Sequence, residues 1–136
     1  MKIMPWAEFT TDLPDDAIEK DGDFIQWPGK NVSEELMIML IRCGYGVSRL
    51  ECLEHAGWEF VIDAGIRSVR CRVTFIEKCL VVFSDDSWLS QLLNSPPHPV
   101  FLKFLKRISA AMANDARFHD VRWFTYSEVM TGIEGA

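Results

Sequence analysis

Residues 47–84 constrain the fold more than any other part of the chain, because apolar and polar residues alternate along them in short runs. Within Ser68–Ile76, for example, Val69, Cys71 and Val73 alternate with arginines and polar residues. This period-two pattern places the apolar residues on one face of a strand. Gaps of two or three residues between the runs are typical of hairpins, so the sequence predicts an antiparallel meander. The expected strands are Val47–Leu53, Trp58–Asp63, Ser68–Ile76 and Cys79–Ser84.

A helix is expected before this block, over Val32–Cys43. Asn31 is an N-cap candidate with Glu34 three residues later, which is a capping-box pattern, and Gly44 is suited to end the helix. The centre of the helix, Leu36–Ile41, is apolar on every side. Such a helix either lies centrally in the core or is covered by a partner.

A second helix is expected over Pro99–Ala113, where apolar residues recur at intervals of three and four. The stripe consists of Phe101, Leu102, Leu105, Ile108 and Met112. Short strands are expected at Phe24–Trp27 and Val121–Tyr126, and a short helix over 88–93. The predicted class is α+β, in the order α-β-β-β-β-α-β, with a mostly antiparallel sheet of four or five strands and helices on one face. The 136 residues fit a single domain.

The negative charge of the chain is concentrated near its N-terminus. The net charge is -6, and residues 8–23 hold seven acidic residues against one base, Lys20. With Pro14, Gly22 and no sustained apolar period, residues 1–23 are predicted to form an acidic, largely irregular arm. Residues 127–136 are expected to be a frayed tail.

An acidic arm can bind a basic partner and steer its approach, or it can simply be a solubilising terminus. Asp85 and Asp86 can extend the same acidic surface or cap a helix, and Trp27 and Trp88 can anchor an interface or pin loops onto the domain. The candidate partner-binding residues are therefore Asp12, Asp15, Asp16, Glu19, Asp21, Asp23, Trp27, Asp85, Asp86 and Trp88.

Several classes of function are disfavoured by composition. A pI of about 5.0 argues against a nucleic-acid partner, whose phosphates require a basic face. No apolar run reaches about 18 residues and no signal peptide is evident, so we expect a cytoplasmic protein without a membrane span. The four cysteines lack the spacing of a zinc site and are expected to be reduced, mostly buried hydrophobes, with no cofactor.

The only candidate catalytic residues that the sequence suggests are histidines. His119 or His55 is a candidate general base, but no nucleophile elbow accompanies either residue. Arg49, Arg70 and Arg72 can line an open sheet face as an anion site. Alternatively, they can pair across strands with acidic residues, namely Glu51, Glu59 and Asp63.

The stretches from Gly57-Trp58-Glu59-Phe60 to Asp115–Trp123 resemble a class of small bacterial α+β proteins. Over about residues 30–126, the chain is also similar in size, acidity and architecture to immunity proteins. Those proteins neutralise toxins of type VI or contact-dependent systems. The resemblance implies a cytoplasmic binding module with a cognate toxin, and it assigns no functional residue.

The leading hypothesis is a non-enzymatic immunity protein or inhibitor that occludes a basic toxin or effector domain. One alternative is an acidic, type III-like secretion chaperone, for which the apolar helix centre at 36–41 is a possible homodimer face. The other alternative is a small enzyme that uses His119 or His55.

Overall fold

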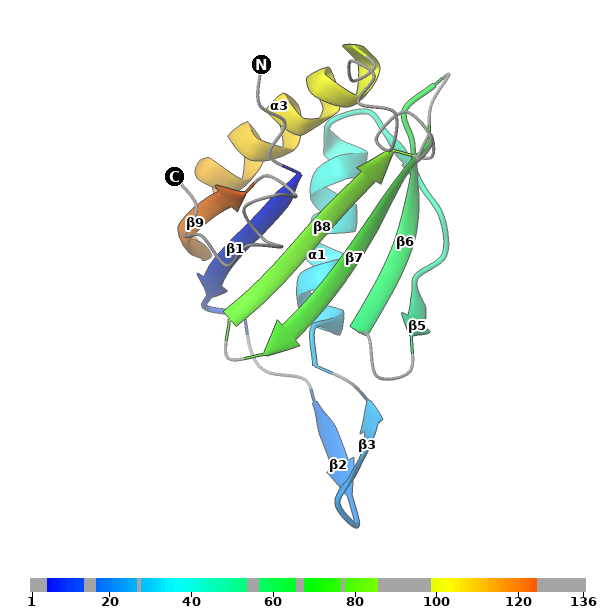
Figure 1. Ribbon diagram of the computed structural model, residues 1–136, viewed down its shortest axis with the longest axis vertical. Helices are drawn as coiled ribbons and strands as arrows, with labels where there is room; N and C mark the ends of the chain where they lie inside the picture. Colours follow the sequence, from blue (N-terminus) through cyan, green and yellow to red (C-terminus); the bar gives the residue numbers. More distant parts are fainter. Residues whose placement is uncertain are drawn as a thin grey trace.

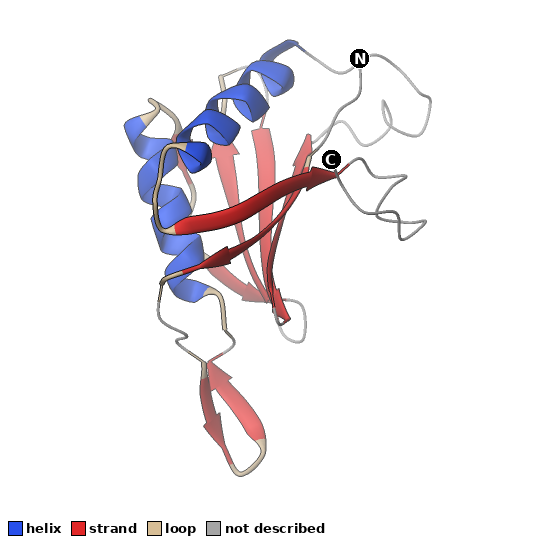
Figure 2. Ribbon diagram, turned by 90° about the vertical axis from the view of Figure 1, so that its left-hand side faces the viewer, coloured by secondary structure: helices blue, strands red, loops and turns tan. Residues whose placement is uncertain are grey.

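The computed structural model describes residues 5–13, 17–26, 28–53, 57–65, 68–76, 78–85 and 99–124. Within these residues the chain forms a large antiparallel sheet and two helices, α1 (Lys30–Arg42) and α3 (Pro99–Ala113). Both helices pack on the same face of the sheet, as the side view in Figure 2 shows. The predicted α+β class, with helices on one face, is therefore confirmed.

The large sheet has seven strands in the described part of the chain, in the order β4-β6-β7-β8-β1-β9, with β5 also pairing with β6 (Figure 1). Every pair in it is antiparallel. The strands are β1 (Trp6–Thr11), β4 (Gly46–Val47), β5 (Glu51–Leu53), β6 (Gly57–Asp63), β7 (Ser68–Ile76), β8 (Lys78–Asp85) and β9 (Phe118–Phe124). The predicted meander corresponds to β6, β7 and β8.

The N-terminal segment departs most from expectation, because the prediction of a largely irregular arm over residues 1–23 is wrong for two strands, β1 and β2 (Ile18–Lys20). Residues 6–11 form β1, which lies between β8 and β9 inside the sheet. Ala7 and Phe9 are buried toward the helices, while the carboxylate of Glu8 lies 3.3 Å from Lys78 Nζ. Apolar and polar residues alternate over only a few positions of β1, and many acidic residues follow it. The alternation is therefore too short to predict a strand.

The expected strand Val47–Leu53 is divided into β4 and β5 because a side chain replaces a backbone acceptor between them. Ser48 N donates a hydrogen bond to Val61 O at 2.8 Å, and Val61 N donates to Ser48 Oγ, also at 2.8 Å. The regular ladder to β6 is therefore interrupted after Val47. This interruption has no apolar signature, which is why a single strand was expected.

The structure contradicts the predicted N-cap of α1 and confirms the predicted role of Gly44 after its C-terminal end. The N-cap position is Gly29, with φ 103°, and not Asn31, because the helix already begins at Lys30. Ser33 Oγ donates a hydrogen bond to the carbonyl of Gly29 at 2.8 Å. The helix ends at Arg42, and Gly44 follows with φ 96°, the left-handed conformation expected after a helix.

The core lies between the sheet and the two helices. The apolar residues that alternate along β6 and β7 are buried: Trp58, Phe60, Ile62, Val69, Cys71 and Val73. Most of the stripe on α3 is also buried, together with Phe104, which the stripe did not include. α1 buries only one side, so it is not enclosed all round. Its buried apolar residues are Val32, Leu36, Met39 and Leu40.

Strand β9 begins at Phe118, three residues before the predicted Val121, because a bulge disturbs its alternation. The register of β1 with β9 shifts between Glu8 and Thr10, and Asp120 has φ 53°. An extra residue on one strand changes the face to which the following side chains point, so the alternation of apolar and polar residues no longer predicts the strand there.

Candidate functional site

An acidic hairpin made of β2 (Ile18–Lys20) and β3 (Asp23–Gln26) stands apart from the large sheet. Among the described strands, β2 and β3 pair only with each other. Figures 1 and 2 both show the hairpin projecting beyond the end of the sheet at which β7 ends and β8 begins. All three residues of β2 are exposed. The segment is therefore a protruding element, placed where a partner can reach it.

The tight turn of this hairpin follows from two residues. Asp21 and Gly22 have φ values of 55° and 84°. A two-residue turn of type I′ requires positive φ at both positions, and Asp-Gly is one of the sequences that adopt it most readily. Lys20 and Asp23 pair directly across the turn. The Asp-Gly dipeptide was the available sequence signal, and the interpretation of Gly22 as a sign of irregular chain missed it.

The hairpin brings three of the predicted partner-binding residues together. Glu19 lies on β2, Asp21 is in the turn, and Asp23 begins β3, against a single amine from Lys20. Glu19 and Asp21 are exposed, and Ile18 adds an apolar side chain that is 48% exposed. Among the side chains that the structure describes there, the hairpin therefore offers negative charges beside the exposed aliphatic group of Ile18.

Two further predicted residues, Asp12 and Asp85, lie away from the hairpin. Asp12 follows β1, and its Oδ2 lies 2.8 Å from Nε2 of His119. Asp85 ends β8 and pairs with Val69, at the end of the sheet opposite the hairpin. The other predicted residues lie outside the described part of the chain: Asp15, Asp16, Trp27, Asp86 and Trp88.

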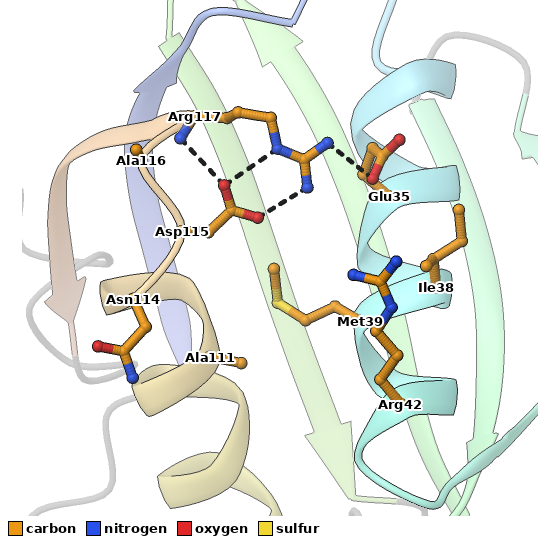
Figure 3. Close-up of a pocket in the computed structure, with 9 residues that line it drawn as sticks. All are labelled: Glu35, Ile38, Met39, Arg42, Ala111, Asn114, Asp115, Ala116 and Arg117. Atoms are coloured by element: carbon orange, nitrogen blue, oxygen red, sulfur yellow. Dashed lines mark hydrogen bonds and ion pairs between the residues drawn. The ribbon is translucent and has the colours of Figure 1, made fainter.

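A second feature, which the sequence did not indicate, is a groove of about 270 Å³ between α1 and the connection from α3 to β9 (Figure 3). Its polar centre is Arg117, which holds the carboxylate of Asp115 through its Nε and Nη2 at 3.0 and 2.7 Å. Arg117 Nη1 also lies 2.9 Å from Glu35 on α1. These contacts tie the connection to the helix.

The charges in this groove are largely satisfied internally. The hydrogen bonds from Arg117 lower the pKa of Asp115 to about 2, with Arg42 as a weaker contributor. The hydrogen bonds to Asp115 and Glu35 raise the pKa of Arg117. Asp115 and Arg117 therefore stay charged at neutral pH, and together with Glu35 they form a structural ion network.

Two of the arginines predicted for the open sheet face, Arg70 and Arg72, are paired with one carboxylate. Arg70 Nη1 lies 3.0 Å from Glu59 Oε1, and Arg72 Nη2 lies 3.0 Å from Glu59 Oε2. The side chain of Glu59 is only 10% exposed, whereas each guanidinium is about half exposed. The alternative in which opposite charges pair across strands is therefore the one observed for this cluster.

The two candidate catalytic histidines differ in their placement. His55 lies outside the described residues. His119 lies on the edge strand β9, its side chain is 45% exposed, and its Nε2 faces Oδ2 of Asp12. A nearby hollow of about 460 Å³ is lined by residues of β1, β8 and β9 but not by His119. Its lining residues are Phe9, Thr10, Lys78, Asp120, Val121 and Arg122.

The described residues contain no group of three or more His, Cys, Asp or Glu side chains placed to hold a metal ion. Neither of the two described helices has the length and apolar character that a membrane-spanning helix requires. Comparison of the chain with protein-family models, with curated proteins and with solved structures gave no match.

Proposed function

We propose that this protein is a non-enzymatic binding protein, an immunity protein or inhibitor that occludes a basic toxin or effector domain. The observation that carries the proposal is the β2–β3 hairpin, because it projects from the sheet (Figure 1) and carries the exposed carboxylates of Glu19 and Asp21 at or next to its turn. Charges arranged in this way steer an oppositely charged partner and fix the orientation in which it docks.

The hairpin is also suited to binding because a bound partner would stabilise it. A two-stranded hairpin is marginally stable by itself in water. Its Asp-Gly turn sets the register without help from the rest of the fold, and Ile18 remains half exposed. A basic cleft with an apolar wall would cover Ile18 and pair with the carboxylates in one contact.

The test removes the negative charge while preserving the hairpin. Glu19→Gln, Asp21→Asn and Asp23→Asn are combined in one variant, and Asn at position 21 keeps the type I′ turn because Asn-Gly adopts it as well as Asp-Gly. A control variant carries Glu51→Gln with Asp63→Asn, which removes two negative charges at exposed positions on the sheet.

The probe is the purified product of the gene adjacent to this one, titrated by calorimetry at low and at physiological salt. The expected result is binding by the wild-type chain and the control, and binding weaker by about tenfold or more for the hairpin variant, with a smaller salt dependence. Equal affinity and equal salt dependence for all three chains would exclude the hairpin from the interface. If the neighbouring product neither binds nor is toxic, the immunity role is wrong.

The secretion-chaperone alternative is kept because one observation favours it. Ile38 and Ile41 on α1 are 42% and 55% exposed, which suits a helix that is covered by another chain. A chaperone of this kind is expected to be a dimer, so a strictly monomeric protein in light scattering would count against this alternative.

A further inference from the structure

The exposed side of α1 is unusually apolar. Ile38 and Ile41 lie three residues apart, so they share one face of the helix, and they are 42% and 55% exposed. Leu36 and Leu40 are fully buried on the sheet side. Among the described residues, only Ile18 on the hairpin is a comparably exposed large hydrophobe. The helix therefore has a second apolar surface that the fold itself does not cover.

Opposite charges stand on either side of these isoleucines. Glu34 precedes Ile38 by four residues and Arg42 follows it by four, and both side chains are exposed. Glu34 reaches only Lys30, with the charged atoms 4.0 Å apart. In the described part of the chain, Arg42 has no ion pair within 4.0 Å, although it lies close enough to Asp115 to lower the pKa of that group.

This surface is complementary to itself. Suppose that a second copy packs its α1 antiparallel against the first, with the two copies of Ile38 face to face. A residue that precedes Ile38 by four positions in one copy then lies near the residue that follows Ile38 by four positions in the other copy. Glu34 of each copy then lies near Arg42 of the partner subunit, and Ile38 packs against Ile38 of the partner subunit at the centre, with Ile41 beside this contact. A two-fold axis generates both ion pairs from one contact, as isologous interfaces require.

We propose that the exposed face of α1 is a homodimer interface in which a second copy of this chain packs antiparallel, centred on Ile38. The helix has 13 residues and is therefore about 20 Å long. Such a face is smaller than the roughly 800 Å² per partner of stable complexes, so the dimer is weak, with a dissociation constant on the order of 10–100 μM.

Sedimentation equilibrium of the full chain, from about 1 to about 500 μM, measures this association. Ile38→Glu is expected to abolish dimerisation, because it places two carboxylates against each other at the centre of the contact. Glu34→Arg and Arg42→Glu each place like charges together twice and are expected to weaken the dimer by about tenfold or more. Circular dichroism checks that each variant keeps its fold.

Two combinations make the test specific for this geometry. The double variant Glu34→Arg/Arg42→Glu exchanges the charges on both copies and should restore the dimer. An equimolar mixture of the two single variants should form a heterodimer, because one face becomes acidic and the other basic. A wild-type chain that stays monomeric throughout the range overturns the proposal, as does failure of both combinations to recover association.

These variants change no residue of the hairpin. The dimer and the toxin-binding role therefore succeed or fail independently of each other.

Discussion

Gly57→Ala tests how closely the start of β6 approaches β7. Gly57 has φ 98°, and a Cβ added there would overlap the carbonyl oxygen of Val73 and lie 3.1 Å from its carbonyl carbon. Because these contacts are with backbone, no side chain can rotate away to relieve them. The two strands must separate at this point. The hydrogen bonds near the Trp58–Val73 pair are therefore the first to be weakened.

The expected loss of stability has two parts. Alanine in a left-handed conformation costs roughly 1–2 kcal/mol. Displacing the strands weakens one or two ladder hydrogen bonds at about 1 kcal/mol each. The free energy of unfolding should therefore fall by about 3 kcal/mol in total, which is large for one methyl group.

Gly44→Ala is the matched control, because Gly44 has φ 96° and no heavy atom lies within 4 Å of the added Cβ. It should lose only the conformational part, roughly 1–2 kcal/mol. Urea unfolding followed by tryptophan fluorescence measures both variants. If Gly57→Ala costs no more than Gly44→Ala, the close approach of β6 to β7 is refuted.

Three further predictions concern charged and thiol groups. Glu59→Gln removes the carboxylate that holds two arginines and should lower the free energy of unfolding by about 2 kcal/mol in urea titrations. Glu51→Gln at the exposed facing position should change it by less than about 0.5 kcal/mol, and equal effects would refute the buried ion-pair argument. The pKa of Asp115 falls from 3.8 to about 2 on folding, so its contribution to stability is present at neutral pH and is lost as the pH falls from about 4 to about 2. Asp115→Asn should flatten this part of a pH series of urea unfolding, and an unchanged slope would contradict the assignment. Burial raises the pKa of the Cys79 thiol to about 12, so a disulfide reagent should label exposed Cys52 first and reach Cys79 only on unfolding.

Much of the architecture was predictable because local apolar periodicity indicates strands and helices. Ser68–Ile76 and Pro99–Ala113 have the predicted bounds, since β7 alternates without interruption and α3 keeps its stripe from end to end. The predictions failed where a single residue changes the geometry. The Ser48 side chain interrupts a ladder, and Asp120 shifts a register.

The candidate site was predictable in its charge and not in its shape. The acidic residues were located by counting, and the type I′ turn at Asp21 could have been found from its sequence. The pairing of Asp12 with His119 and of Glu35 with Arg117 joins segments far apart in the chain. No spacing rule connects such residues, because their distance depends on how the elements pack.

The sequence by itself determined the two helices, the strands β6, β7 and β8, and where the negative charge lies, since these depend on neighbours within a few residues. The tertiary structure alone decided that β1 enters the sheet between β8 and β9. It also decided that the acidic hairpin projects from the sheet and that Ile38 remains outside the core. These outcomes depend on burying apolar faces against distant partners, and a one-dimensional pattern specifies the face but not the partner.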